Sequence, residues 1–371
     1  MSGKVLGTEV FDSLIPLLAE LGYRVVGPTV REEAIVWGDI EAATDLPIGW
    51  TDVQEAGHYR IEPRDDNAYF AYTVGPRTLK TYLFPARQTL LTIENAETGL
   101  RFRPEPLDEP PYAFLGVRAC EIAAAAIQDS VFDGSSYADP SYAARRKRSF
   151  TIAVNCSVAG NTCFCDSMGT GPRASNGFDL VVTEILEGNR HEFVVESGSE
   201  QGAAVLSDLA GRAPTESDEQ TIASIMKNTV DHMGRSMDET ATRALLIENL
   251  DHPIWDDIAA RCLACTNCTL VCPTCFCSTV EDATDLLGTA TRTRRWDSCF
   301  SSDFSNLHGH PVRSSTRSKY RQWMTHKLSY WYDQFGMSGC VGCGRCITWC
   351  PVAIDITAEM AQLKEESEAS T

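Results

Sequence analysis

Two stretches of this 371-residue chain repeat one cysteine pattern, in which four cysteines are separated by two, two and three residues and are followed by proline. The stretch CLACTNCTLVCP supplies Cys262, Cys265, Cys268 and Cys272. The stretch GCVGCGRCITWCP supplies Cys340, Cys343, Cys346 and Cys350. Three thiolates on so tight a loop can bind three corners of a cubic iron-sulfur cluster, while the fourth cysteine of the run binds a neighbouring cluster. The repeat therefore predicts two 4Fe-4S clusters that exchange their fourth ligands.

On this logic the first cluster has the ligands Cys262, Cys265, Cys268 and Cys350, and the second has Cys340, Cys343, Cys346 and Cys272. A pair of structural zinc sites is the alternative, because C-x2-C pairs also bind zinc. The third cysteine and the proline of each motif have no role in a zinc site, so the pattern favours clusters. The glycines of the second motif permit either close approach of the backbone to a cluster or an ordinary turn, and both remain open: Gly339, Gly342 and Gly344.

The other seven of the fifteen cysteines are also grouped, and the tetrapeptide Thr-Cys-Phe-Cys occurs twice. In the first half of the chain, four cysteines follow strand-like runs and could converge on a third 4Fe-4S cluster: Cys120, Cys156, Cys163 and Cys165. They could equally be buried structural cysteines. The remaining trio is Cys275, Cys277 and Cys299, which His308, His310, Asp297 or Asp303 could complete. We expect the trio to pack beside the first cluster instead.

The elements that position these cysteines change character along the chain. Strand-like runs at 113–117, 150–154 and 178–185 alternate with helical sequence, and a turn at 187–189 predicts a hairpin. From about residue 216 apolar side chains recur at helical spacing, over 218–237, 238–262 and 313–336, before a polar tail, 364–371, that we expect to fray. We predict an α+β fold, with a mixed α/β domain over 1–245 and a helical two-cluster ferredoxin-like domain over 246–371.

Composition limits where the protein acts. A net charge of −19 repels a phosphate backbone, so no nucleic-acid partner is expected. No run of about eighteen apolar residues and no signal peptide is evident, so we expect no membrane partner and a cytoplasmic location. Fifteen cysteines in that compartment indicate metal or redox chemistry rather than disulfides. No dinucleotide fingerprint, P-loop, zinc-protease motif or nucleophile elbow occurs, so no catalytic residue is predicted and the clusters describe an electron relay.

Five motifs in this order resemble one known family: FLGVRACE, CFCDSMGTGP, CTLVCPTCFC, WDSCF and GCVGCGRCITWCP. They look like the beta, iron-sulfur subunit of the cytosolic NADP-reducing group 3b nickel-iron hydrogenases, or sulfhydrogenases. The electron-transfer subunit of anaerobic sulfite reductase shares this skeleton. The resemblance runs from about 114 to 356, and HGHPVR and YRQWMTHKLSYW look closer to the hydrogenase branch.

The resemblance implies a non-catalytic subunit of a hydrogen:NADP⁺ oxidoreductase. Its partners would be the nickel-iron small and large subunits and a flavin subunit that binds NADP(H). The eight ferredoxin-type cysteines match the family pattern without departure, whereas the roles of the other seven are not settled by it. The alternatives to this function are the electron-transfer subunit of an anaerobic sulfite reductase and a structural zinc-binding scaffold.

Overall fold

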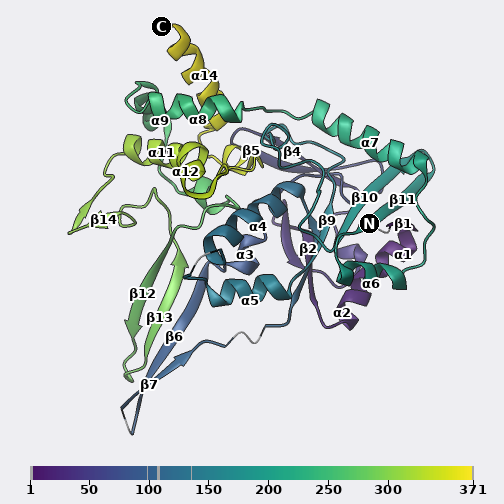
Figure 1. Ribbon diagram of the computed structural model, residues 1–371, viewed down its shortest axis with the longest axis horizontal. Helices are drawn as coiled ribbons and strands as arrows, with labels where there is room; N and C mark the ends of the chain where they lie inside the picture. Colours follow the sequence, from purple (N-terminus) through teal and green to yellow (C-terminus); the bar gives the residue numbers. More distant parts are fainter. Residues whose placement is uncertain (1–2, 98, 107–108, 135, 370–371) are drawn as a thin grey trace.

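The computed structural model describes residues 3–97, 99–106, 109–134 and 136–369. Its largest element is a seven-stranded sheet with the order β1-β11-β10-β9-β8-β2-β3, and the four central strands, β10, β9, β8 and β2, are parallel (Figure 1). The strands are β1 (Gly3–Gly7), β2 (Arg24–Arg31), β3 (Ala34–Asp39), β8 (Tyr112–Val117), β9 (Phe150–Val154), β10 (Leu180–Glu187) and β11 (Arg190–Ser197). The strands predicted at 113–117, 150–154 and 178–185 are confirmed, as is the hairpin that joins β10 to β11.

Helices cover both faces of this sheet. Successive side chains of a strand point to opposite faces, so the apolar residues of the strands form a separate core on each face. Leu115, Ile152 and Val182 belong to one core, together with residues of α1 (Thr8–Asp12), α2 (Leu14–Glu20) and α6 (Glu200–Asp208). Phe114, Ala153 and Val181 belong to the opposite core, together with residues of α3 (Lys80–Leu83), α4 (Ala119–Phe132) and α5 (Pro140–Arg148). Helix α7 (Glu216–Asp231) packs against β10 and β11 through Ile222 and Met226.

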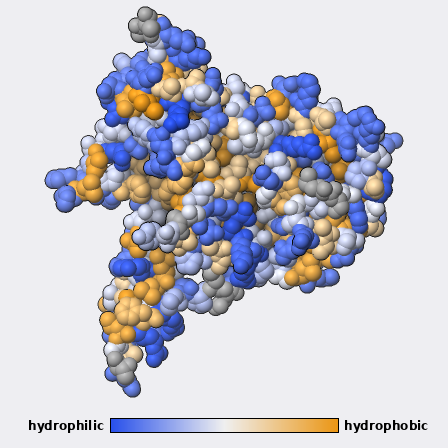
Figure 2. All heavy atoms as spheres, viewed as in Figure 1, coloured by the Kyte–Doolittle hydropathy of each residue, from blue (hydrophilic) through white to orange (hydrophobic). Residues whose placement is uncertain are grey.

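A second sheet forms an arm that projects from the rest of the molecule (Figure 1). Its order is β12-β13-β6-β7, with β6 (Arg87–Ala96), β7 (Gly99–Pro104), β12 (Ser278–Thr284) and β13 (Ala290–Trp296). Figure 2 shows apolar side chains on this arm, and Phe102, Leu286 and Leu287 are among its exposed residues. The arm joins strands from both sides of residue 245, so the domain boundary placed there stays a prediction.

The C-terminal part is mainly helical. Its helices are α8 (Glu239–Glu248), α9 (Ile254–Arg261), α10 (Asn267–Leu270), α11 (Thr316–Thr325), a π-helix (His326–Tyr330), α12 (Trp331–Phe335), α13 (Arg345–Thr348) and α14 (Ile356–Ala369). The helix predicted over 238–262 is interrupted before Pro253, and α14 continues through the tail to Ala369, so the expected fraying from 364 is wrong for the described residues. Small elements complete the chain: η1 (Ala43–Asp45), β4 (Trp50–Glu55), β5 (His58–Pro63), β14 (Asn306–Leu307) and β15 (His310–Pro311).

The α+β fold class is confirmed, with a mixed sheet-and-helix part that precedes a largely helical one. Among the described residues, no helix combines the length and the apolar character that a membrane crossing requires.

Candidate iron-sulfur sites

The four cysteines predicted to hold the first cluster lie around one small cavity. Cys262 follows α9, Cys265 and Cys268 lie on the loop and short helix that come next, and Cys350 follows α13. All four line the cavity, and Phe300, Tyr320 and Trp323 form part of its wall. We call these four cysteines set 1. Cys265 is exposed, so set 1 lies at the surface of the protein.

The cysteines predicted for the second cluster also face one another, and we call them set 2. The thiol of Cys340 lies close enough to Cys343 and Cys272 to interact with them electrostatically. The thiol of Cys346 interacts in the same way with Cys340, Cys343 and Cys272. Burial raises the pKa of Cys340 to about 12, so in the metal-free chain this thiol keeps its proton at neutral pH. Cys346 also lines the cavity of set 1, which makes the two sets neighbours.

Set 3 consists of the four cysteines proposed for a third cluster, and the structure brings them together as well. Parallel strands β8 and β9 are neighbours, which places Cys120, at the start of α4, and Cys156, after β9, at the same edge of the sheet. Cys163 and Cys165 lie on the loop after β9, and both face Cys156. Cys165 also faces Cys120. Burial raises the pKa of Cys163 to about 12.

Sets 2 and 3 are in contact through glycine. The carbonyl of Gly342 accepts a hydrogen bond of 2.8 Å from the amide of Phe164. Gly344 has a positive φ of 74°, and a β-carbon there would lie 2.4 Å from the carbonyl oxygen of Thr162. Because these glycines have no side chain, the loop of set 3 can approach the backbone of the second motif closely. The sequence alone left open an approach to a cluster or an ordinary turn, and it did not predict this contact between two loops. Cys343 consequently faces Cys120, Cys163 and Cys165.

Buried cations accompany sets 2 and 3. The Nζ atom of Lys327 donates hydrogen bonds to the sulfur of Cys272 at 3.2 Å, to Thr274 Oγ1 at 2.9 Å and to the carbonyl of Gly339 at 3.0 Å. Burial alone would lower the pKa of Lys327, but the facing sulfurs of Cys272 and two other cysteines raise it well above its usual value. Lys327 is thus held as a cation beside set 2.

Arg345 and Arg118 have the same relation to set 3. Arg345 is fully buried, pairs with Glu121 at 2.7 Å and faces Cys343 and Cys120. Arg118 donates to the carbonyls of Phe70 and Tyr72 and faces Cys156. One terminal nitrogen, Nη1, of each arginine has no hydrogen-bond partner in the described part of the chain. Buried cations with unused donors fit an anionic group between the cysteines, such as a cluster held by four thiolates.

The residues fit clusters better than single metal ions. Zinc requires four donors at about 2.0–2.3 Å from one point. Among the described residues, no three His, Cys, Asp or Glu side chains are arranged to hold one ion. The ligands of a cubic cluster each bind a different iron and therefore stand farther apart.

The prediction that the remaining trio packs beside the first cluster holds for Cys299, which belongs to the same apolar cluster as Cys262 and Cys268. Cys275, Cys277 and Cys299 line a separate cavity of about 410 Å³, and Cys299 also faces Cys268 of set 1. None of the four residues suggested to complete a site lines this cavity: His308, His310, Asp297 and Asp303. His326 and Lys327, which sequence reasoning did not connect with the trio, line it instead. Both residues lie on the π-helix, and no motif in the sequence indicated that this segment would line a cavity with the trio.

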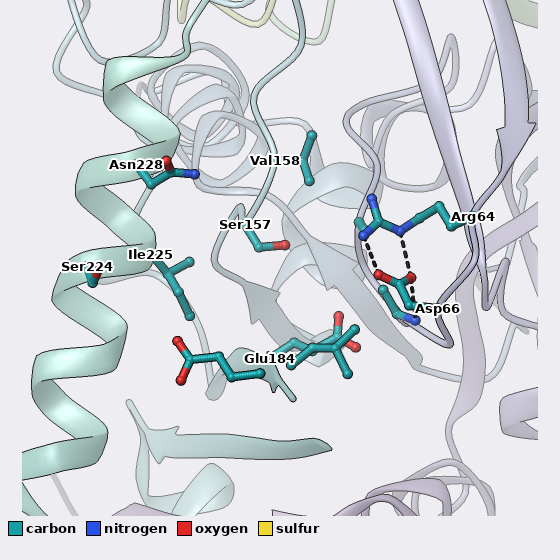
Figure 3. Close-up of a pocket in the computed structure, with 12 residues that line it drawn as sticks. Arg64, Asp66, Ser157, Val158, Glu184, Ser224, Ile225 and Asn228 are labelled. Atoms are coloured by element: carbon teal, nitrogen blue, oxygen red, sulfur yellow. Dashed lines mark hydrogen bonds and ion pairs between the residues drawn. The ribbon is translucent and has the colours of Figure 1, made fainter. Parts of the chain in front are cut away.

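A further cavity of about 350 Å³ lies between α7 and the segment that contains Arg64 and Asp66 (Figure 3). Arg64 and Asp66 pair with each other there, and Ser157 and Glu184 also line this cavity (Figure 3). No cysteine lines this cavity in the described residues, although Ser157 directly follows Cys156 of set 3.

Comparison with known proteins agrees with this geometry. The family model of a 4Fe-4S dicluster domain matches residues 261–354, which contain all of sets 1 and 2. The sulfhydrogenase 2 subunit beta of Pyrococcus furiosus is 27% identical over 369 residues, covering 97% of this chain and 98% of that protein. A serine palmitoyltransferase structure from S. paucimobilis is 12% identical, with a TM-score of 0.19 over 60% of this chain and 57% of its own. The predicted resemblance is confirmed: the chain is similar to a sulfhydrogenase beta subunit over nearly its whole length, and residues 261–354 match a 4Fe-4S dicluster domain.

Proposed function

We propose that this chain is the iron-sulfur electron-transfer subunit of a sulfhydrogenase-type complex. In that complex it relays electrons between nickel-iron hydrogenase small and large subunits and a flavin subunit that binds NADP(H). The observation that carries the proposal is the succession of three neighbouring cysteine sets. Cys346 of set 2 also lines the cavity of set 1, and Cys343 of set 2 faces Cys120 of set 3. The fifteen cysteines favour the reducing environment of the cytoplasm.

The ligands that we propose are the three sets as defined above, and each 4Fe-4S cluster, when bound, accepts and releases one electron at a time. The chain's own residues control the surroundings. Tyr320 and Trp323 are buried against set 1 and exclude water from it. Lys327 donates to the sulfur of Cys272 in set 2. Donors of this kind raise the reduction potential of a cluster.

The location of the sets also indicates where electrons enter and leave. Set 1 has an exposed member, Cys265, and the neighbouring Leu263 is 63% exposed. In sets 2 and 3, Cys272, Cys340, Cys343, Cys120, Cys163 and Cys165 are all buried. We therefore propose that a partner subunit docks over set 1 and that set 2 is the interior link.

Iron analysis of the anaerobically purified chain tests the proposal. We expect about twelve irons per chain with matching sulfide, and about eight in Cys163→Ser, because three sets of four cysteines hold three four-iron clusters. Cys277→Ser, outside the three sets, is the matched control and should keep the wild-type content. A wild-type content of about eight irons would remove set 3 from the relay, and zinc without iron would refute the function. Bound flavin with NADP(H) oxidation by the isolated chain would assign it the role of the flavin subunit instead.

A further inference from the structure

The cavity of the trio lies at the base of the projecting arm. Cys277 immediately precedes β12, and Cys299 follows β13 by three residues. These two strands pair from Ser278 with Trp296 onward, and the amide of Asp297 donates to the carbonyl of Cys277 at 2.9 Å. The hairpin therefore fixes Cys277 and Cys299 at the same end of two paired strands, on the wall of one cavity.

The two thiols are close enough to hydrogen-bond with each other. They are not joined by a disulfide in this structure. A close thiol pair held by paired backbone is the arrangement that forms and breaks a disulfide without large movement. Cys275 lines the same cavity but hydrogen-bonds to Cys272 of set 2 instead. The pair is thus distinct from the third cysteine of the trio.

The cavity has a positive lining. Arg313 and Lys327 contribute charge to it, and among the described residues that line it there is no Asp or Glu. Arg313 has no ion pair within the described residues, so its charge is available to a ligand. Burial, with help from the charges of Lys327 and Arg313, lowers the pKa of His326 to about 4, so this ring is neutral at physiological pH. The hydrogen bond from Cys299 lowers the pKa of Cys277 to about 7, which gives it substantial thiolate character near neutral pH.

We infer that Cys277 and Cys299 form a redox-active dithiol that reduces small, negatively charged disulfides in this cavity. The Cys277 thiolate attacks one sulfur of the substrate, forming a mixed disulfide and releasing the first substrate thiolate. The Cys299 sulfur then attacks the Cys277 sulfur while its proton passes to the departing substrate sulfur, which is released as a thiol and leaves a Cys277–Cys299 disulfide. Two electrons and two protons return that disulfide to the dithiol, and only this return step rests on the proposed electron-transfer function.

Trapping of the mixed disulfide tests the inference on the full anaerobically purified chain. The probe is dithiodipropionate, which is small and anionic, and the readout is peptide mass mapping together with iron content. Cys299→Ser should accumulate one mercaptopropionate adduct on Cys277, because the resolving thiol is absent. Wild type should form the Cys277–Cys299 disulfide instead, and Cys277→Ser, which lacks the attacking thiol, is the negative control that should form neither product.

Charge selection gives a second readout. Arg313→Gln should slow adduct formation with dithiodipropionate on the order of tenfold and leave the neutral hydroxyethyl disulfide unaffected, because only the anion loses an attraction. Absence of the adduct from Cys277 in iron-replete Cys299→Ser would overturn the inference. Loss of about four irons per chain in Cys277→Ser would overturn it too, since Cys277 would then be a cluster ligand. Low iron in the wild type would speak against the proposed relay alone, because trapping does not depend on it.

Discussion

Replacement of Lys327 by methionine should lower the reduction potential of the cluster at set 2. The Lys327 ammonium lies 3.2 Å from the Cys272 sulfur, and an electron added to a cluster there would lie about 6 Å away on average. At an effective dielectric constant of about 20, unit charges at that separation attract by about 3 kcal/mol. Since about 1.4 kcal/mol corresponds to about 59 mV for one electron, we expect a decrease of roughly 100 mV.

The assay is a potentiometric titration followed by electron paramagnetic resonance on the reconstituted chain. Lys364→Met, on the exposed face of α14, is the control and should leave every potential unchanged. The iron content of Lys327→Met must equal that of wild type, which separates a charge effect from a lost cluster. A shift smaller than about 20 mV at full iron content, or a shift confined to the signal lost in Cys163→Ser, would refute the placement of this charge beside set 2.

Three further outcomes follow from the geometry. Cys350→Ser should remove the cluster of set 1, whose other ligands lie in the first motif, and leave the one built on Cys340; spectra showing the opposite loss would disprove the ligand exchange. Gly344→Ala should lower the free energy of unfolding by about 3 kcal/mol in urea, because a β-carbon would lie 2.4 Å from the Thr162 oxygen, whereas Gly336→Ala, with a similar φ but open space, should lose only about 1 kcal/mol; equal losses would contradict the close approach. In the metal-free chain, burial holds the pKa of Cys163 near 12, above its unfolded value, so its proton stabilises the fold below about pH 9 and this contribution is lost as pH rises toward 12. Urea titrations should therefore show wild type losing about 1.4 kcal/mol per pH unit relative to Cys163→Ala above pH 9, and parallel curves would argue against burial.

Local sequence carried much of the fold and of the candidate sites. The two C-x2-C-x2-C-x3-C-P motifs predicted both the groups in sets 1 and 2 and the exchange of Cys272 and Cys350, because the spacing itself determines which thiols can share a loop. Set 3 was predictable from strands that end at Val117 and Val154, because neighbouring parallel strands bring their carboxyl ends together.

What could not be predicted depends on pairing between distant segments. The arm forms because β13 pairs with β6, about two hundred positions away in the chain, and neither strand shows strict alternation of apolar residues. Lys80 reads in the sequence as an ordinary surface lysine. In the structure it is buried and donates to the carbonyls of Leu270, Cys272 and Cys275. Tertiary contacts of this kind override local propensity and leave no periodic signal.

The distribution of buried charge supports anionic groups at the cysteine sets. The chain carries a net charge of −19, yet four of its buried basic side chains lie against cysteines or their backbone: Lys80, Arg118, Lys327 and Arg345. Only Arg345 among these four has a carboxylate partner within the described residues, namely Glu121. Burial of an unpaired cation is unfavourable by several kcal/mol unless an anion compensates it. For Lys327 and Lys80 part of that negative charge comes from Cys272, whose pKa is lowered by a hydrogen bond from Cys275 and by the two lysines. Beside the arginines, burial raises the pKa values of Cys120 and Cys156, so these thiols do not supply an anion, whereas thiolates bound to iron would. Negatively charged clusters at sets 2 and 3 would compensate the buried arginines, and we expect the loss of iron to destabilise this region first.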